Sequence, residues 1–290
     1  MSALPQQQVA AVMHRRIGDI TVSTISDGFL EGSMAVMQNI TVEESSDMLR
    51  AAFRPVPRRT AVNTFLIRSK GRTALVDTGC GTKMQATGGR LLAHLAAIGV
   101  APAEVDTVLL THMHPDHSNG LTDDNGAKHF PNAELVMHAA EPRFWLDDAS
   151  MAGHDETSRL RNFQHAREQI APYEKRLFEG GEVFPGVTAM PLPGHTPGHS
   201  GYLVASGNDQ LLIWGDIVHV PEVQVPRPEV TMAFDIDPTA AAATRRRMFD
   251  HVATDKLLVA GMHIHFPGYA HLVREAGSYR MVFDAFQQWL

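Results

Sequence analysis

The sequence has a single cysteine, no long apolar run and no extended basic segment, and each absence excludes a class of protein. Cys80 is the one cysteine in 290 residues, which excludes an internal disulfide framework and a cysteine-rich zinc site. No stretch approaches the ~18 consecutive apolar residues of a membrane-spanning helix. The net charge is −7, and the basic run Arg245-Arg246-Arg247 lies in a predicted helix, where a solvated face is the simpler interpretation. Neither a membrane nor a nucleic acid is therefore an expected partner.

The beginning of the chain also lacks a targeting signal. Residues Met1 to Val12 have neither the charged start nor the apolar core of a secretory leader. We therefore expect a cytoplasmic protein, although a secreted form cloned without its leader would look the same.

The most informative stretch is Thr111-His112-Met113-His114-Pro115-Asp116-His117-Ser118-Asn119-Gly120, in which metal-ligand residue types are concentrated. It follows an apolar run, 105–110, that predicts a buried strand. His112 and His114 are two residues apart, so an extended backbone directs both side chains toward one ion. Pro115 is expected to prevent a helix, which leaves Asp116 and His117 free to reach a second ion. Imidazole and carboxylate ligands suit zinc and related first-row metals, and this spacing disfavours a loop whose histidines only bind water.

The pattern H-x-H-x-D-H resembles that of the metallo-β-lactamase superfamily of di-metal hydrolases, and the resemblance extends over most of the chain. Gly194-His195-Thr196-Pro197-Gly198-His199 looks like its second motif, Trp214-Gly215-Asp216 like its third, and Gly261-Met262-His263 follows an apolar strand as its last ligand does. The resemblance implies two divalent ions, most simply zinc, with manganese, cobalt or iron as alternatives. The implied ligands of the first ion are His112, His114 and His195; those of the second are Asp116, His117 and His263, and Asp216 bridges both.

The resemblance also implies the fold, an α/β αββα sandwich with mixed, mostly antiparallel sheets. We expect one domain over residues 1–290, with residues 1–14 as a loose N-terminal arm. Helices are predicted over 43–53, with Thr41 as N-cap, over 238–252, with Asp237 as N-cap and Pro238 at the first position, and over 158–177 until Pro172 interrupts it. Strands are predicted over 17–26, 62–67, 73–76 and 278–283, among others.

A di-metal site of this kind implies hydrolysis. A hydroxide that bridges the ions would be the nucleophile, since metal-bound water has a pKa near ~7 in favourable zinc sites, and Asp116 or a water would protonate the leaving group. The bridging carboxylate Asp216 resembles lactonases, thioesterases and organophosphate hydrolases, whereas true β-lactamases carry a cysteine or serine near that place.

The segment 261–271 is similar to methyl parathion hydrolase and its lactonase relatives, which implies a homodimer and a set of pocket walls. By position these walls are Met84, Trp145, Phe163, His219 and Phe234. Met84, His219 and Phe234 depart from the residue types of methyl parathion hydrolase, so a lactone or related ester is the expected substrate, with organophosphate triesters as promiscuous ones. Phosphotriesterase, thioesterase and β-lactamase activities remain alternatives, as does a mono-iron persulfide dioxygenase outside the hydrolases.

Two neighbouring side chains are expected to support the site without binding metal. Asp77 and His199 are interpreted as hydrogen-bonding partners of the ligands, and His265 competes with His263 only if the strand register shifts. Cys80 lies at a strand-end turn with no activating partner and is not expected to be a nucleophile.

Overall fold

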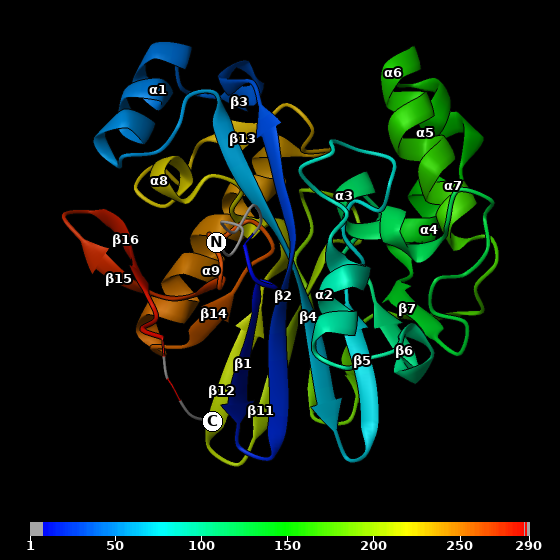
Figure 1. The fold of residues 1–290 in the computed structure, drawn as a ribbon. Coiled ribbons are helices and arrows are strands. Elements are labelled where there is room, and N and C mark those ends of the chain that lie inside the picture. Colours follow the sequence, from blue (N-terminus) through cyan, green and yellow to red (C-terminus); the bar gives the residue numbers. More distant parts are fainter. Residues whose placement is uncertain (1–7, 287, 289–290) are drawn as a thin grey trace, which may run out of the picture.

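Two large sheets form the centre of the molecule in the computed structural model, which describes residues 8–286 and 288 (Figure 1). Each sheet is 7-stranded, and a 2-stranded pair lies apart from them. In spatial order the first sheet contains β1 (Val12–Ile17), β2 (Ile20–Gly32), β4 (Arg58–Ser69), β5 (Arg72–Val76), β6 (Thr107–Leu109), β7 (Glu134–His138) and β8 (Lys175–Phe178). The second contains β16 (Ser278–Phe283), β15 (Tyr269–Glu275), β14 (Leu258–Ala260), β12 (Asp209–Ile213), β11 (Ser200–Ser206), β10 (Val187–Pro191) and β9 (Gly181–Phe184). The small pair is β13 (Thr231–Met232) with β3 (Met37–Gln38).

Strand directions are mixed, and antiparallel pairs predominate. Adjacent strands from β5 to β8 run parallel to one another, and β12 runs parallel to β14; the remaining pairs, including β4 with β5, are antiparallel. The predicted α/β sandwich with mostly antiparallel sheets is therefore confirmed.

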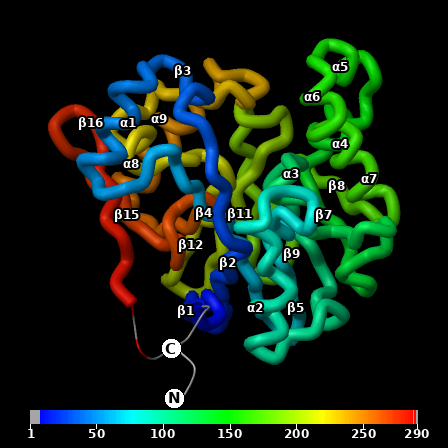
Figure 2. Tube along the Cα trace, turned by 45° about the horizontal axis from the view of Figure 1, so that its top comes forward, coloured from blue at the N-terminus to red at the C-terminus, as the bar shows by residue number. Residues whose placement is uncertain are grey.

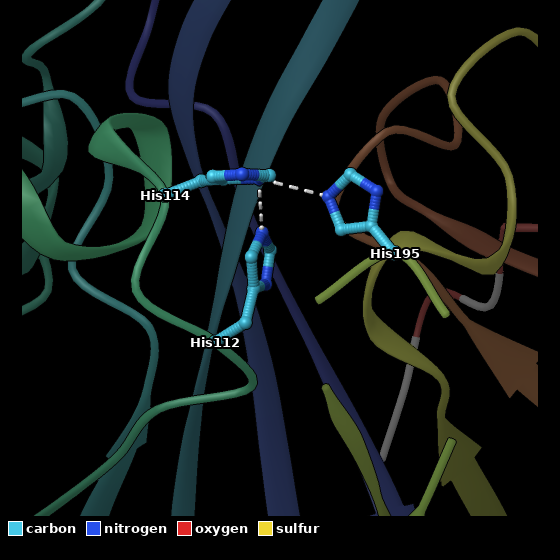
Figure 3. A group of neighbouring side chains, drawn as sticks. All are labelled: His112, His114 and His195. Carbon is cyan, nitrogen blue, oxygen red and sulfur yellow. Dashed lines mark hydrogen bonds between the residues drawn. The ribbon is translucent and has the colours of Figure 1, made fainter. Parts of the chain in front are cut away.

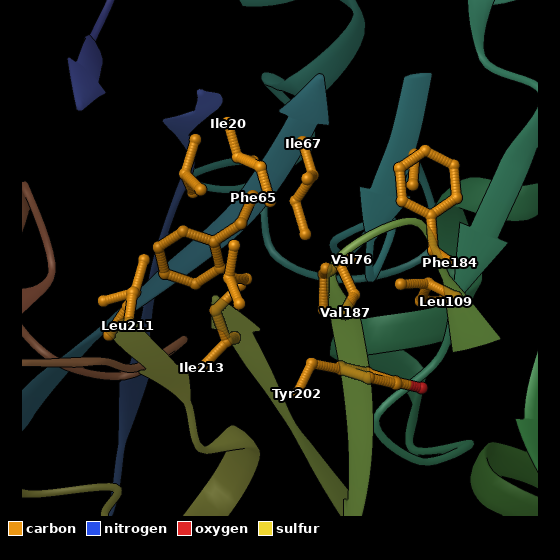
Figure 4. Close-up of a cluster of buried hydrophobic side chains, with 14 of the residues drawn as sticks. Ile20, Phe65, Ile67, Val76, Leu109, Phe184, Val187, Tyr202, Leu211 and Ile213 are labelled. Atoms are coloured by element: carbon orange, nitrogen blue, oxygen red, sulfur yellow. The ribbon is translucent and has the colours of Figure 1, made fainter. Parts of the chain in front are cut away.

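The central strands are buried on both faces, so alternate residues enter different layers of the core. On β4, Phe65 and Ile67 point between the sheets, whereas Leu66 packs under the outer helices of the first sheet. On β12, Leu211 and Ile213 face inward, and Leu212 packs on the other side with α9 residues. Figure 4 shows the resulting inter-sheet cluster, in which side chains of both sheets meet. A strand inside a sandwich therefore needs a continuous apolar run, because successive residues point to opposite faces and both faces are buried.

The helices cover the outer faces and one edge. They are α1 (Val42–Ala51), α2 (Leu91–Ala97), α3 (Pro115–Ser118), α4 (Ala140–Trp145), α5 (Asp148–Ala152), α6 (Glu156–Ser158), α7 (His165–Ile170), α8 (Pro221–Gln224) and α9 (Pro238–Thr254). A π-helical turn spans Arg159–Gln164, and 3₁₀ turns span Met34–Val36, Pro102–Glu104, Asn119–Leu121 and Gly215–Ile217. Figure 2 shows α4 to α7 gathered on one side of the molecule, away from α1, α8 and α9.

The predicted helix starts are confirmed at two caps. Thr41 and Glu44 form a capping box at α1, because the Thr41 hydroxyl accepts the Glu44 N–H and the Glu44 carboxylate accepts the Thr41 N–H. At α9 the Asp237 side chain accepts the Ala240 N–H, and Pro238 occupies the first turn, where its missing N–H has no cost.

Two predictions about local structure are wrong, and a third is wrong at one end. Strand β1 starts at Val12, so the arm predicted over 1–14 does not reach residue 14; residues 1–7 lie outside the described part. Helix α3 begins at Pro115, because proline is compatible with the first turn of a helix although not with its interior. The helical segment predicted from residue 158 ends at Ile170, as expected from the interruption at Pro172. The end of the predicted range is different, because Lys175–Phe178 form edge strand β8 through main-chain pairing with β7.

Candidate metal centre

All the predicted ligands lie in the segments that follow the carboxyl ends of strands. His112 and His114 follow β6, His195 follows β10, Asp216 follows β12, and His263 follows β14. These strands point in the same direction in their sheets, so residues separated by more than a hundred positions meet at one edge of the sandwich. Asp116 and His117 join them from α3, the short helix directly after His114.

The first predicted ligand group is assembled. The Nε2 atom of His112 lies 3.0 Å from Nδ1 of His114, which lies 2.9 Å from Nε2 of His195 (Figure 3). These three rings are buried, and one nitrogen of each converges on the other two. Zinc–nitrogen bonds of ~2.0–2.1 Å in a tetrahedral site separate the ligand nitrogens by little more than these distances. The three imidazoles could therefore hold one ion after small side-chain adjustments.

The second predicted group is also assembled, and Asp216 lies between the two. Asp116, His117 and His263 place their ligand atoms within 4.8 Å of one another. The Oδ2 atom of Asp216 is 3.2 Å from Nε2 of both His117 and His263, and 3.3 Å from Nε2 of His195. One carboxylate oxygen thus contacts members of both groups, which is the position that a bridging ligand needs.

The electrostatics of the site are those of several imidazoles around one buried carboxylate. Burial alone would disfavour every charge here, yet the carboxylates of Asp216, Asp116 and Asp77 raise the pKa of His117 well above its usual value. Burial also opposes protonation of His195, but Asp216 and Asp235 raise its pKa to about 9. In return, His117 and His263 hold the pKa of Asp216 well below its usual range in spite of burial. Divalent ions would take the place of these protons, because metal ligands bind in their deprotonated forms.

Two buried atoms support the fit to metal. Nε2 of His117 and Oδ1 of Asp216 are inaccessible to solvent and have no hydrogen-bond partner among the described residues. Buried polar atoms are rarely left without a partner, since each costs ~1–3 kcal/mol. Metal coordination by these atoms would remove that cost.

Three of the ligand rings, those of His117, His195 and His263, are oriented by a hydrogen bond of the second ring nitrogen. Nδ1 of His117 is 2.7 Å from Oδ2 of Asp77, which confirms the structural role expected for that aspartate. Nδ1 of His263 is 2.7 Å from the Ala61 carbonyl oxygen. Nδ1 of His195 is 2.6 Å from Oδ1 of Asp235, a partner that the sequence did not reveal. Such contacts fix which ring nitrogen faces the ion.

Comparison with known proteins agrees with this geometry. The Metallo-beta-lactamase superfamily matches residues 57–263 of the chain. The chain belongs to this superfamily. A hydrolase of the beta-lactamase superfamily, AbOPH, has a structure with a TM-score of 0.90 at 30% identity, covering 97% of this chain and 100% of that one. The structure of AidC, a dizinc quorum-quenching lactonase, superimposes with a TM-score of 0.89 at 24% identity, covering 96% and 99%.

Curated relatives match over shorter stretches. An N-acyl homoserine lactonase from Bacillus sp is 32% identical over 40% of this chain and 39% of its own length. A probable metallo-hydrolase from Mycobacterium tuberculosis is 29% identical over 53% and 56%. The chain thus spans about half the length of the curated relatives it matches. Membership in this superfamily, with a full set of ligand-type side chains, supports a metal-dependent hydrolase.

Glu141 is a second buried carboxylate that the sequence did not identify, and it joins two ligand loops of this superfamily site. Its Oε2 accepts the Met113 N–H at 2.9 Å and the Trp145 indole N–H at 2.8 Å; its Oε1 accepts the Gly198 N–H at 2.8 Å and the Thr196 hydroxyl at 2.5 Å. Burial raises the pKa of Glu141, and the four donors counteract that rise. The carboxylate therefore ties the backbone beside His112 and His114 to the backbone beside His195.

A cavity of about 340 Å³ opens beside the ligand groups, and some of the residues predicted to form a pocket wall line it. Met84, His219 and Phe234 line it, together with His114, Asp116, Asp216 and His263. The placement of Trp145 and Phe163 in this wall is corrected. Both are fully buried and lie outside the residues that line the cavity; Trp145 packs against the His114 ring from behind, at 5.4 Å between centroids, and Phe163 packs on Trp145 at 4.8 Å.

His219 is more than a wall residue, because it contacts the bridging carboxylate. Its Nε2 lies 3.1 Å from Oδ2 of Asp216, and its ring stacks on that of His263 at 5.2 Å between centroids. Neither ring nitrogen has a hydrogen-bond partner within the described part of the chain, although the side chain is buried. His219 therefore lines the cavity with at least one ring nitrogen, Nδ1, that no described residue engages.

His199, His265 and Cys80 lie near the site and are not members of the ligand groups. Nε2 of His199 accepts the Asp216 N–H at 2.8 Å, and its Nδ1 donates to the Leu192 carbonyl oxygen at 2.8 Å, so both nitrogens are engaged. Gly215 has φ of 60° and passes so close to this ring that a Cβ would lie 2.3 Å from Nε2. Nε2 of His265 pairs with Glu222 at 2.6 Å, away from the ligand groups. Burial raises the pKa of the Cys80 thiol far above its usual value, so it is no nucleophile.

Asp235→Asn is expected to weaken metal binding by about 10–100-fold. The carboxamide offers only one oxygen, so it cannot accept from both His195 and the Met232 N–H, which bonds the second carboxylate oxygen at 2.8 Å. Affinity can be measured by competition with a chromophoric chelator. Asp237→Asn is the matched control, because asparagine is an equally good N-cap and Asp237 contacts no ligand; equal affinities in the two variants would contradict the role given to Asp235.

Proposed function

We propose that the protein is a di-metal hydrolase, most simply a zinc enzyme, that opens lactones or cleaves related carboxylic esters. The observation that carries this proposal is the pair of ligand groups that share Asp216 and face one cavity. When bound, two such ions supply a water of pKa near ~7 as nucleophile and polarise the carbonyl that it attacks. The proposed ligands are His112, His114 and His195 for one ion, Asp116, His117 and His263 for the other, and Asp216 for both.

The chain's own residues would then select and orient the ester. Met84 and Phe234 would contact its apolar part, and a ring N–H of His219 would donate a hydrogen bond to one of its oxygens. Asp116 lines the cavity with a partly exposed carboxylate, and it would carry the proton to the leaving alkoxide. The relatives named N-acyl homoserine lactonase support a lactone as the substrate class, and organophosphate triesters are proposed only as secondary substrates.

Cellular placement and assembly are part of the proposal as well. Among the described residues no helix is both long enough and apolar enough to cross a membrane. A cytoplasmic location and a homodimer stay predictions; fractionation and sedimentation velocity would test them.

The deciding experiment combines elemental analysis with a substrate panel of lactones, methyl paraoxon and nitrocefin. We expect about two zinc-like ions per chain and lactone turnover that a chelator abolishes and added metal restores. A single iron, with no turnover of any lactone, phosphotriester or β-lactam, would overturn the hydrolase proposal in favour of a mono-iron persulfide dioxygenase.

A further inference from the structure

Arg58 is a cavity residue that the metal chemistry does not use. It is the first residue of β4 and pairs in register with Gly32 at the end of β2. Its guanidinium lies directly over that glycine: a Cβ on residue 32 would be 2.7 Å from Nη2 and 2.9 Å from Cζ. Glycine at position 32 therefore leaves the space that allows Arg58 to line the cavity beside Asp116 and His219.

The charge of Arg58 has no carboxylate partner in an ion pair within the described residues. Its Nη1 donates to the Thr60 hydroxyl, and its Nε is buried with no hydrogen-bond partner in the described chain. Burial lowers the pKa of Arg58, and the charge of Asp116 counteracts this. Asp116 belongs to the second ligand group. A metal ion bound by that group would neutralise part of the Asp116 charge and leave less of it to balance Arg58. A largely buried, unpaired cation is costly unless an anion joins it.

The neighbouring Arg59, unlike Arg58, has a carboxylate partner. Arg59 Nε pairs with Glu31 Oε1 at 2.8 Å, and its guanidinium lies 5.0 Å from the centre of the Phe29 ring. Glu31 also borders the cavity, but Arg59 already occupies its carboxylate. Arg161 borders the cavity from the π-helical turn and forms no ion pair within the described residues. The wall outside the ligand groups is therefore cationic.

From this geometry we infer that Arg58 binds an anionic group of the substrate, and that the natural ester or lactone carries a carboxylate. A guanidinium matches a carboxylate with hydrogen bonds from its nitrogens, and Nη2 of Arg58 forms no hydrogen bond within the described residues. Arg161 at the rim would add attraction over a longer range. The inference rests on the proposed ester hydrolysis for its substrate class, but the anion site itself can be measured separately.

The test compares 4-nitrophenyl hexanoate with mono-4-nitrophenyl adipate, which has the same leaving group and chain length but ends in a carboxylate. With the metal-loaded protein, we expect kcat/KM to favour the adipate. R58M should reduce that preference by about 10–100-fold, the range for a hydrogen-bonded charge pair, and R58K should restore part of it. R59M is the matched control: it removes an adjacent, already paired arginine and leaves Glu31 unpaired at the cavity rim, so it should lower the preference far less than R58M does.

A binding measurement separates this inference from the proposed function. Calorimetry on the metal-loaded protein would use N-methyladipamic acid and the neutral N-methylhexanamide, which are not esters. Tighter binding of the acid, lost in R58M and kept in R59M with equal metal content, supports the anion site even if neither ester is hydrolysed. Equal binding of the acid by R58M and R59M, or an unchanged ester preference in R58M, overturns the inference and leaves ester hydrolysis standing.

Discussion

Asp216→Ala is expected to lose hydrolytic activity and at least one of the two proposed ions. One oxygen of Asp216 lies within 3.3 Å of ligand nitrogens from both groups, so its removal takes a ligand from each ion at once. It also leaves buried imidazoles without the carboxylate that favours their charged forms. The loss in kcat/KM should exceed the ~10–100-fold that removal of an outer hydrogen-bonding partner causes. Elemental analysis and lactone turnover on the same sample measure both effects.

Two further variants make this result interpretable. Asp216→Asn keeps the shape but not the charge, and it should also lose metal if bridging by a carboxylate is the cause. Asp209→Asn changes an exposed aspartate at the other end of β12 and should retain both ions and full activity. Two retained ions with near-normal turnover in Asp216→Ala would exclude the bridging role.

Glu141→Ala is expected to destabilise the fold by at least about 3 kcal/mol, because four buried donors lose their acceptor together. Two of these donors are backbone N–H groups in ligand loops and cannot turn toward water without moving the loop. The free energy of unfolding should be taken from urea titrations, with the slope checked for a change in the denatured state. Metal affinity should fall in the same variant, since Met113 lies between two ligand histidines.

Two control variants test the role of Glu141: a conservative substitution at the same position and a substitution of an exposed glutamate. Glu141→Gln keeps the volume but turns an amino group toward two of the donors, so its loss should be intermediate. Glu134→Gln removes a half-exposed ion pair between Glu134 on β7 and Arg176 on β8, and it should lower the free energy of unfolding by less than ~1 kcal/mol. If Glu141→Ala lowered the free energy of unfolding by less than ~1 kcal/mol, the ligand loops would not depend on this carboxylate.

Short-range sequence patterns were enough to predict part of the metal centre and two helix starts. The ligands between 112 and 117 share one strand-end loop, so their spacing alone indicated a metal. The capping signals at Thr41 and Asp237 are equally local, and both were correct because a cap needs only neighbours within one turn. His195, Asp216 and His263 were identified through motifs that resemble those of the superfamily. Their spacing alone would not show that they meet.

Tertiary structure decided what depends on contacts between distant segments. Asp235 reaches His195 across 40 residues, and Glu141 reaches Gly198 across 57, so no local pattern marks either carboxylate. Trp145 and Phe163 are aromatic residues of the kind that often line pockets, yet packing places them behind the wall. Arg58 faces the cavity because β2 pairs with β4 and because the opposing residue is glycine. Sequence by itself determined residue types, periods and caps; which side chains share a cavity, and which charges remain unpaired, depended on strand pairing and packing.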